Sequence, residues 1–193
     1  MEHRMNLPLT GEKAALLHAG DLLFLSGIIY TARDAAHRRL FHLLETGEAL
    51  PFPLKDEIIY YVGPSPARPG RIIGAAGPTT SSRMDSYTPA LLSLGLRGMI
   101  GKGTRSAAVV QKMRETGAVY LGAIGGLGAL LADRIKAARI IAFAELGTEA
   151  VHCLTVEDFP TVVIIDSRGN NLYQIGRAAY ISRFTELPQK PGP

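Results

Sequence analysis

The chain has 193 residues, and its hydrophobic fraction of 47% and charged fraction of 20% are typical of a folded protein with a sizeable core. The formal net charge of +4 comes from scattered lysines and arginines. Because no basic run is longer than Arg38-Arg39, the pattern favours a solvated surface with a basic pocket over nucleic-acid binding. We expect a single domain over residues 1–185 and a flexible tail over residues 186–193.

The single cysteine, Cys153, limits the chemistry of the chain. It excludes an intrachain disulfide, and it excludes a cysteine-rich metal or iron–sulfur site built by this chain alone. The first residues lack the apolar core of a signal peptide, and no apolar run approaches the roughly 18 residues of a membrane span. We therefore expect a cytoplasmic protein with no membrane segment and no metal ligands of its own.

In chain order, the first half of the sequence predicts alternating strands and helices. Short apolar runs indicate strands at residues 7–10, 22–26, 57–62 and 71–75. Helical spacing indicates a helix at residues 12–18 with Thr10 as N-cap, and another at residues 32–45 with Thr31 as N-cap. A proline-rich connector at residues 51–55 and a turn-rich link at residues 63–70 separate these elements.

The second half continues the alternation. We expect partly helical structure at residues 84–94, helices at 104–115 and within 122–131, and strands at 97–100, 118–121, 138–144 and 161–166. Residues 145–150 predict a short helix or turn, residues 151–156 a short strand or helix, and residues 172–175 a hairpin partner for the preceding strand. This order predicts an α/β fold with a mixed, mostly parallel sheet.

Two glycine-framed turns within residues 77–103 form the most informative stretch. The first, GPTTSSR, offers four hydroxyls and consecutive backbone N–H groups before a short helix, which suits a bound anion. Arg83 ends this turn and can hold a planar carboxylate with two hydrogen bonds. The second turn, GKG, places Lys102 between a strand and a helix as a second carboxylate clamp. The alternatives are an N-cap cluster with a surface arginine and a plain strand-to-helix turn.

Arg33 and His37 lie four residues apart, so they share one face near the start of the helix predicted at residues 32–45. An anion held by Arg33 and the helix N-terminus would explain a cation where the helix dipole disfavours one. His37 is either a structural histidine or a proton carrier. The remaining histidines lack metal-ligand spacing, and the glycines at residues 122–128 favour a close-packed turn over a phosphate site.

The string GPTTSSRMDSYTP at residues 77–89 and the string MIGKG at residues 99–103 resemble one family closely. They are similar to the C-terminal domain, or separate β subunit, of class I (iron–sulfur) fumarate hydratase, a family that includes the β subunit of L(+)-tartrate dehydratase. The segments YTARDAAHRR at residues 30–39 and ELGTEA at residues 145–150 match as well. The resemblance extends from about Leu7 to Arg183 and implies a swivelling β/β/α domain.

The resemblance also implies reversible addition of water to fumarate, giving (S)-malate. In this family a 4Fe–4S cluster has three cysteine ligands in the other domain or in an α subunit, and its open iron binds the substrate. Cys153 alone cannot hold such a cluster. The chain would therefore be half of an enzyme, a β subunit in a hetero-oligomer whose α subunit carries the cluster.

By the same resemblance, a C4 dicarboxylate substrate would be held by Arg33, Thr80, Arg83 and Lys102. His37 and Thr79 would be catalytic, with Thr79 as the proposed proton-abstracting base. A free threonine is a poor base, so Thr79 would need activation by a neighbouring carboxylate or by the partner's cluster.

Two other functions remain open at this point. The first is the β subunit of L(+)-tartrate dehydratase, which has the same chemistry on a hydroxylated diacid, although the string MDSYTP at residues 84–89 favours a fumarase. The second is a stand-alone domain that binds small dicarboxylates or nucleotides without catalysis. Dependence on a cysteine-bearing partner chain would distinguish the catalytic functions from the non-catalytic one.

Overall fold

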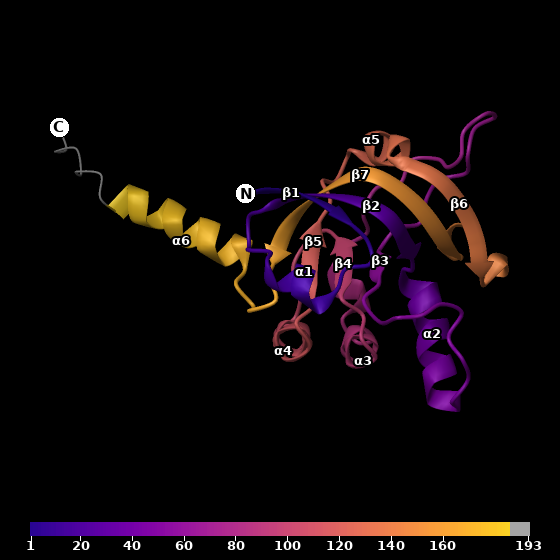
Figure 1. Ribbon diagram of the computed structural model, residues 1–193, viewed down its shortest axis with the longest axis horizontal. Helices are drawn as coiled ribbons and strands as arrows, with labels where there is room; N and C mark the ends of the chain where they lie inside the picture. Colours follow the sequence, from indigo (N-terminus) through magenta and orange to yellow (C-terminus); the bar gives the residue numbers. More distant parts are fainter. Residues whose placement is uncertain (186–193) are drawn as a thin grey trace, which may run out of the picture.

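The computed structural model describes residues 1–185, so the tail predicted at residues 186–193 lies outside the described residues. Within residues 1–185, one seven-stranded sheet has the order β1-β2-β3-β4-β5-β7-β6 (Figure 1). The strands are β1 (Glu2–Asn6), β2 (Leu22–Thr31), β3 (Ile58–Tyr60), β4 (Gly98–Gly101), β5 (Val119–Gly122), β6 (Ile135–Ala142) and β7 (Val151–Ile165). The neighbours from β1 to β5 are parallel, whereas β7 is antiparallel to β2, β5 and β6. The expected α/β fold with a mixed, mostly parallel sheet is confirmed.

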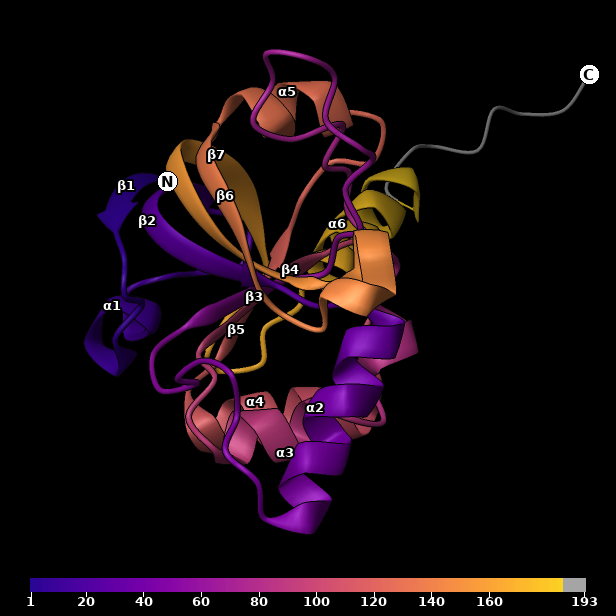
Figure 2. The same cartoon turned by 90° about the vertical axis from the view of Figure 1, so that its right-hand side faces the viewer.

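Helices cover one side of the sheet and both of its ends. They are α1 (Gly11–Ala15), α2 (Asp34–Thr46), α3 (Thr88–Ser93), α4 (Ala107–Thr116), α5 (Gly128–Asp133) and α6 (Leu172–Thr185), together with the 3₁₀ helices η1 (Ser81–Met84) and η2 (Ala144–Glu149). Figure 2 shows α2, α3 and α4 together on one side and α5 at the opposite end. In Figure 1, α6 extends away from the body of the molecule. None of the described helices combines the length and the apolar character that a membrane crossing requires.

The last strand closes the sheet on itself. Most of β7 pairs with β2, from Val162 opposite Leu22 to Cys153 opposite Tyr30. The end of β7 pairs with β5, where Val163 lies opposite Leu121. Strands β2, β3, β4, β5 and β7 therefore form a small closed barrel, and β6 pairs with the start of β7 outside it.

Alternating side chains of the barrel strands divide the apolar residues into two cores. In β3, Ile58 and Tyr60 belong to the core inside the barrel. Ile59 and Tyr61 point the other way, into the core between the sheet and α2, α3 and α4. Because both faces of these strands are buried, their sequences are continuous apolar runs rather than alternating ones.

Several predicted element boundaries are confirmed by the capping contacts. Thr10 is the N-cap of α1 and accepts a hydrogen bond from the Lys13 N–H. Pro89 lies in the first turn of α3, where a missing N–H is tolerated. Residues 151–156, predicted as a short strand or helix, and the strand expected at residues 161–166 are joined in the single strand β7.

Other predictions about elements are wrong. Strand β1 is formed by residues 2–6 rather than 7–10, and residues 71–75 lie in a loop. Thr31 pairs with Tyr60 at the end of β2, so Arg33 and not Thr31 occupies the N-cap position of α2. Residues 172–175 begin α6 rather than a hairpin strand.

Candidate active site

The carboxyl ends of β3, β4 and β5 meet at one end of the barrel, and the first glycine turn folds onto this end. The Thr79 N–H donates to the Tyr61 carbonyl (2.7 Å), and the Lys102 N–H donates to the Thr79 carbonyl (3.2 Å). The Ser81 N–H donates to the Lys102 carbonyl (2.9 Å). The turn therefore lies between the extensions of β3 and β4, with Thr80 paired beside Lys102. The two turns that the sequence singled out are neighbours in space.

Glycine at position 101 allows this close approach. A Cβ there would lie 2.0 Å from Ser81 Oγ and 3.0 Å from a ring carbon of Tyr61. The buried Ser81 hydroxyl is in turn hydrogen-bonded to the Tyr120 hydroxyl (2.9 Å). Gly103 has a φ of 80°, which a residue with a side chain rarely adopts. The GKG sequence thus fixes the backbone of Lys102 while leaving its side chain exposed.

Arg83 and Arg33 come from different elements and are joined by Asp34. The Arg83 Nε donates to Asp34 Oδ1 (2.7 Å), and Arg33 Nε lies 3.5 Å from Asp34 Oδ2. Burial would raise the pKa of Asp34, but its backbone hydrogen bond and the two arginines outweigh burial and lower this pKa. Asp34 is therefore an ionised carboxylate that holds two cations at the start of α2.

A second carboxylate, Glu149 of η2, also lies at the start of α2. Its Oε2 accepts a hydrogen bond from the Ala35 N–H (2.8 Å), and its Oε1 lies 3.4 Å from Arg33 Nη2. The sequence predicted an anion held jointly by Arg33 and this helix N-terminus, and Glu149 is such an anion within the chain itself. Sequence reasoning missed it because Ala35 and Glu149 are 114 positions apart.

His37 is fully buried in the first turns of α2. Its Nδ1 lies 3.1 Å from the Arg33 carbonyl oxygen, which can only accept, so Nδ1 carries the proton. Burial lowers the pKa of His37 to about 4, which keeps the ring neutral near pH 7. Nε2 is then an acceptor, and within residues 1–185 it has no hydrogen-bond partner. The ring packs beside Tyr61 and Tyr87.

A buried cation supports the site from the helical side of the sheet. Arg105 donates to Asp85 (2.8 Å), to the Thr88 hydroxyl (2.7 Å) and to the Tyr61 hydroxyl (3.1 Å). Asp85 also accepts from the Ser106 N–H (2.6 Å) at the N-cap of α4. These bonds fix η1, α3 and α4 relative to β3. No motif in the sequence distinguished Arg105 or Asp85 from surface charges.

These contacts bring all of the predicted site residues into one connected region, which comprises Arg33, His37, Thr79, Thr80, Arg83 and Lys102. Within residues 1–185, no carboxylate is hydrogen-bonded to the Thr79 hydroxyl. Thr80, Arg83 and Lys102 are exposed, Arg33 and Thr79 are half-buried, and His37 is fully buried beneath them. No cluster of three or more His, Cys, Asp or Glu side chains suited to a metal ion occurs in the described part of the chain.

The fold and the site together define an α/β barrel domain that collects cations and hydroxyl groups at the ends of its parallel strands. The family model named Fumarase C-terminus matches residues 2–176. The chain belongs to this family, and its resemblance to class I fumarate hydratase and tartrate dehydratase β subunits is confirmed.

Two fumarate hydratases are similar to this chain over part of their length. Fumarate hydratase 2 from Leishmania major is 42% identical over 156 residues, which are 80% of this chain and 28% of that protein. Fumarate hydratase class I, anaerobic, from Escherichia coli (strain K12) is 44% identical over 154 residues, which are 79% of this chain and 28% of that protein. The chain thus spans about 28% of the length of these relatives.

A third relative has nearly the same length as this chain. The putative L(+)-tartrate dehydratase subunit beta from Methanocaldococcus jannaschii is 37% identical over 193 residues, covering 97% of this chain and 98% of that protein. The family therefore contains this domain both within longer proteins and as a protein of about this size.

Proposed function

We propose that this chain is the β subunit of a two-subunit class I fumarate hydratase, which adds water to fumarate reversibly to give (S)-malate. The observation that carries the proposal is the gathering of Arg33, Arg83 and Lys102 around the turn that contains Thr79. Three cations beside hydroxyl groups suit a small substrate with two carboxylates. The similarity to fumarate hydratases from two organisms supports the same substrate class.

The cations would bind the substrate and stabilise charge during the reaction. Removing the proton next to a carboxylate of malate builds negative charge on that carboxylate, and fixed cations and N–H groups stabilise it. The Arg83 side chain is 48% exposed, so it can exchange the Asp34 carboxylate for a substrate carboxylate. Lys102 would bind the other end of the substrate with Thr80, its neighbour across the two turns.

Thr79 and His37 would carry the proton transfer. Thr79 lies on the same turn as Thr80 and Arg83, so its hydroxyl would be within reach of a substrate that these residues hold. Since this chain supplies no carboxylate to the Thr79 hydroxyl within the described residues, its activation would come from the partner chain. The neutral His37 ring can accept a hydrogen bond at Nε2 but is a weak base near pH 7.

A 4Fe–4S cluster does not fit the residues of this chain. Cys153 is its single cysteine, and the described residues contain no alternative ligand cluster. We therefore place the cluster on an α subunit, with the substrate bound between the two chains of a hetero-oligomer. A chain with a single free thiol also suits the reducing cytoplasm, which is the proposed compartment.

The β subunit of L(+)-tartrate dehydratase is the second candidate function. One observation favours it. The chain matches 98% of the length of the Methanocaldococcus jannaschii protein named putative L(+)-tartrate dehydratase subunit beta. The same cations would bind tartrate, so the geometry of this chain does not separate the two substrates.

The test is to purify the chain with its cluster-carrying partner under anaerobic conditions and to measure kcat/KM for fumarate, malate and tartrate. The chain alone should be inactive. In the assembled enzyme, Arg83→Ala or Lys102→Ala should each lower kcat/KM by about a hundredfold, the scale of one lost transition-state contact. Arg4→Ala is the control, because Arg4 pairs with Asp158 away from the site. Activity of the isolated chain would contradict the two-subunit assignment, and unchanged kinetics of both variants would contradict the carboxylate clamp.

A further inference from the structure

The loop from Pro64 to Ala75 protrudes from the barrel with a fixed shape. The Ser65 N–H donates to the Ala75 carbonyl (3.1 Å), and the Ala75 N–H donates to the Ser65 hydroxyl (2.9 Å). A Cβ on Gly74 would lie 2.1 Å from the Ser65 carbonyl oxygen, so the two arms of the loop are in close contact. Figure 2 shows this loop beside α5, at the opposite end from α2, α3 and α4. A preformed loop binds a partner without the entropy cost of ordering it.

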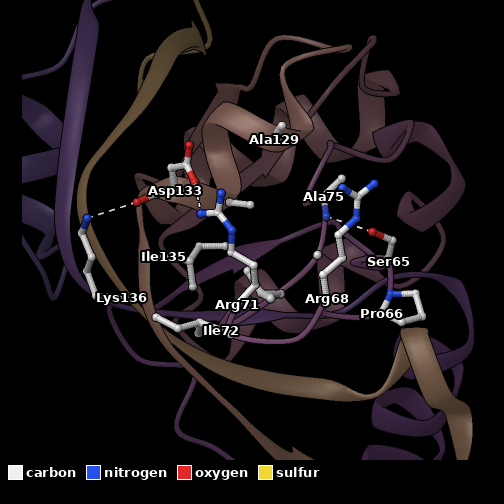
Figure 3. A pocket seen from close by; sticks show the side chains of 14 residues that line it. Ser65, Pro66, Arg68, Arg71, Ile72, Ala75, Ala129, Asp133, Ile135 and Lys136 are labelled. Carbon is white, nitrogen blue, oxygen red and sulfur yellow. Dashed lines mark hydrogen bonds and ion pairs between the residues drawn. The ribbon is translucent and has the colours of Figure 1, made fainter.

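A basic hollow of about 470 Å³ lies on one side of the loop, against α5 and β6. Ile73 and Ile135 are among its apolar lining residues, and its cations are Arg68, Arg71 and Lys136. Figure 3 shows the two arginine side chains extending from the loop in the same direction. Its one lining carboxylate within the described chain, Asp133, is paired with Arg71 (3.2 Å). Lys136 Nζ also lies 3.8 Å from Glu157 Oε2, so Arg68 is the cation of this hollow for which the described residues supply no ion-pair partner.

A second hollow, of about 440 Å³, lies on the other side of the same loop. Its lining is mainly apolar and includes Ile72 and Ile140, whose side chains are 53% and 48% exposed. These two side chains give the hollow an exposed apolar lining that apolar side chains of another protein could bury. The basic hollow and the apolar hollow share Ile72 and Ile73, so they form one continuous surface around the loop.

This surface borders the candidate active site at both ends of the loop. Just before the loop, a Cβ on Gly63 would lie 2.8 Å from Arg33 Nη1 and 3.1 Å from the Thr148 carbonyl oxygen. Thr148 lines the second hollow and precedes Glu149, which holds Arg33. After the loop, Pro78 pairs with Val62 and leads directly to Thr79. A protein that covers the active-site residues from this end therefore also meets the loop.

We propose that the Pro64–Ala75 loop, with the hollow on each side of it, is the docking surface for the cluster-bearing partner chain. The inference rests on the proposed function, which requires such a partner. The matching segment of the partner carries a carboxylate for Arg68 beside apolar side chains for Ile72. A second copy of this chain would bring the same basic rim against itself, which electrostatic complementarity disfavours.

The test measures binding of the intact chain to its separately purified, cluster-loaded α chain by anaerobic interferometry. Arg68→Glu and Ile72→Glu should each weaken binding at least tenfold, and the wild-type affinity should fall as salt is raised from 50 to about 300 mM. Each variant has a matched control at an exposed residue elsewhere on the surface. Lys55→Glu is the control for Arg68→Glu, and Leu16→Glu is the control for Ile72→Glu. Both controls should bind within twofold of the wild type, and thermal melts of all four variants check that they fold.

The possible outcomes separate the docking surface from the proposed function. If the wild type binds the α chain and both loop variants bind equally well, the docking surface is wrong while the two-subunit function stands. If the wild type binds no cluster-bearing chain at any salt concentration, the proposed function is overturned and the docking surface with it. If sedimentation shows that the chain alone dimerises and Ile72→Glu abolishes the dimer, the surface belongs to a second copy instead.

Discussion

The Asp34 carboxylate interacts with two arginines at once. Its Oδ1 accepts a hydrogen bond from Arg83, and its Oδ2 lies beside Arg33. Oδ2 is buried and has no hydrogen-bond partner among residues 1–185, so its interaction with Arg33 is purely electrostatic in this geometry. We propose a positioning role, in which Asp34 keeps both arginines at the start of α2 for the proposed substrate carboxylate.

Asp34→Asn tests this positioning role. The amide keeps the size of the side chain but removes the charge that holds two arginines, so we expect KM for the dicarboxylate to change about tenfold in the assembled enzyme while kcat changes less. A merely structural role would lower the free energy of unfolding without separating KM from kcat. Arg39, paired with Glu145 on the exposed side of α2, provides the control variant Arg39→Gln.

His37 predicts a specific dependence of stability on pH. Its pKa is about 4 when folded, against a usual value of 6.5, so between these values the unfolded chain binds a proton that the folded chain does not. The free energy of unfolding should therefore fall as the pH drops from about 6.5 towards 4, by up to about 3 kcal/mol.

Urea unfolding at pH 7.0, 5.5 and 4.5 measures this dependence. His37→Gln should have a flatter profile, because glutamine can still donate to the Arg33 carbonyl but does not titrate. The difference between the two profiles removes the contribution of other groups, such as the half-buried His152, whose pKa is also lowered by burial. Parallel profiles for the two proteins would show that His37 is not buried as a neutral ring.

At the residue scale, the sequence predicted the cations and hydroxyls of the site but not the carboxylates between them. Lys102 and Arg83 stand out because glycines, hydroxyls and a helix start lie next to them in the chain. Asp34 and Glu149 acquire their roles only through contacts with residues distant in sequence, 49 positions away for Arg83 and 114 for Ala35. A single sequence holds no local signal for such pairs.

At the scale of elements, the end of β4 and the start of η1 act as one packed unit through Gly101 and Ser81. Gly101→Ala should lower the free energy of unfolding by about 1–3 kcal/mol, because the new methyl group overlaps the buried Ser81 hydroxyl. Adding Ser81→Ala should restore part of this loss.

The control is Gly176→Ala in α6, where no atom lies within 4 Å of the new Cβ. That substitution should be neutral or stabilising by up to about 1 kcal/mol, as helix propensity predicts. Chemical denaturation compares the three variants, and an unaffected Gly101→Ala protein would contradict the packing argument.

The element predictions failed where distant pairing decides the structure. Residues 27–31 extend β2 well past the apolar run because Ile28, Ile29 and Tyr30 pair with residues 153–155 of β7. Thr31 pairs with Tyr60 of β3 at the end of this extension, so α2 begins at Asp34. Residues 172–175 contain apolar side chains after a glycine turn, a pattern that a hairpin and a helix start share, and they form the helix α6.

At the scale of the whole molecule, the closed barrel should unfold as one cooperative unit. Amides of β2, β3, β4, β5 and β7 are expected to exchange with deuterium only through global unfolding, because opening one strand breaks the barrel. Amides of α6, which extends from the body, should exchange much faster (Figure 1). Native-state hydrogen exchange at low denaturant measures both groups. Equal protection of α6 and the barrel would contradict this division.

The position of β7 in the chain has a consequence for biosynthesis. The strand that closes the barrel is the last strand of the described chain, and it meets β2 at Leu22 and Val162. Strands β1 to β5 are parallel neighbours and can associate earlier, but β2 and β5 keep open edges until β7 is made. A nascent chain without β7 therefore presents unpaired strand edges, which favour aggregation until β7 pairs with β2 and β5.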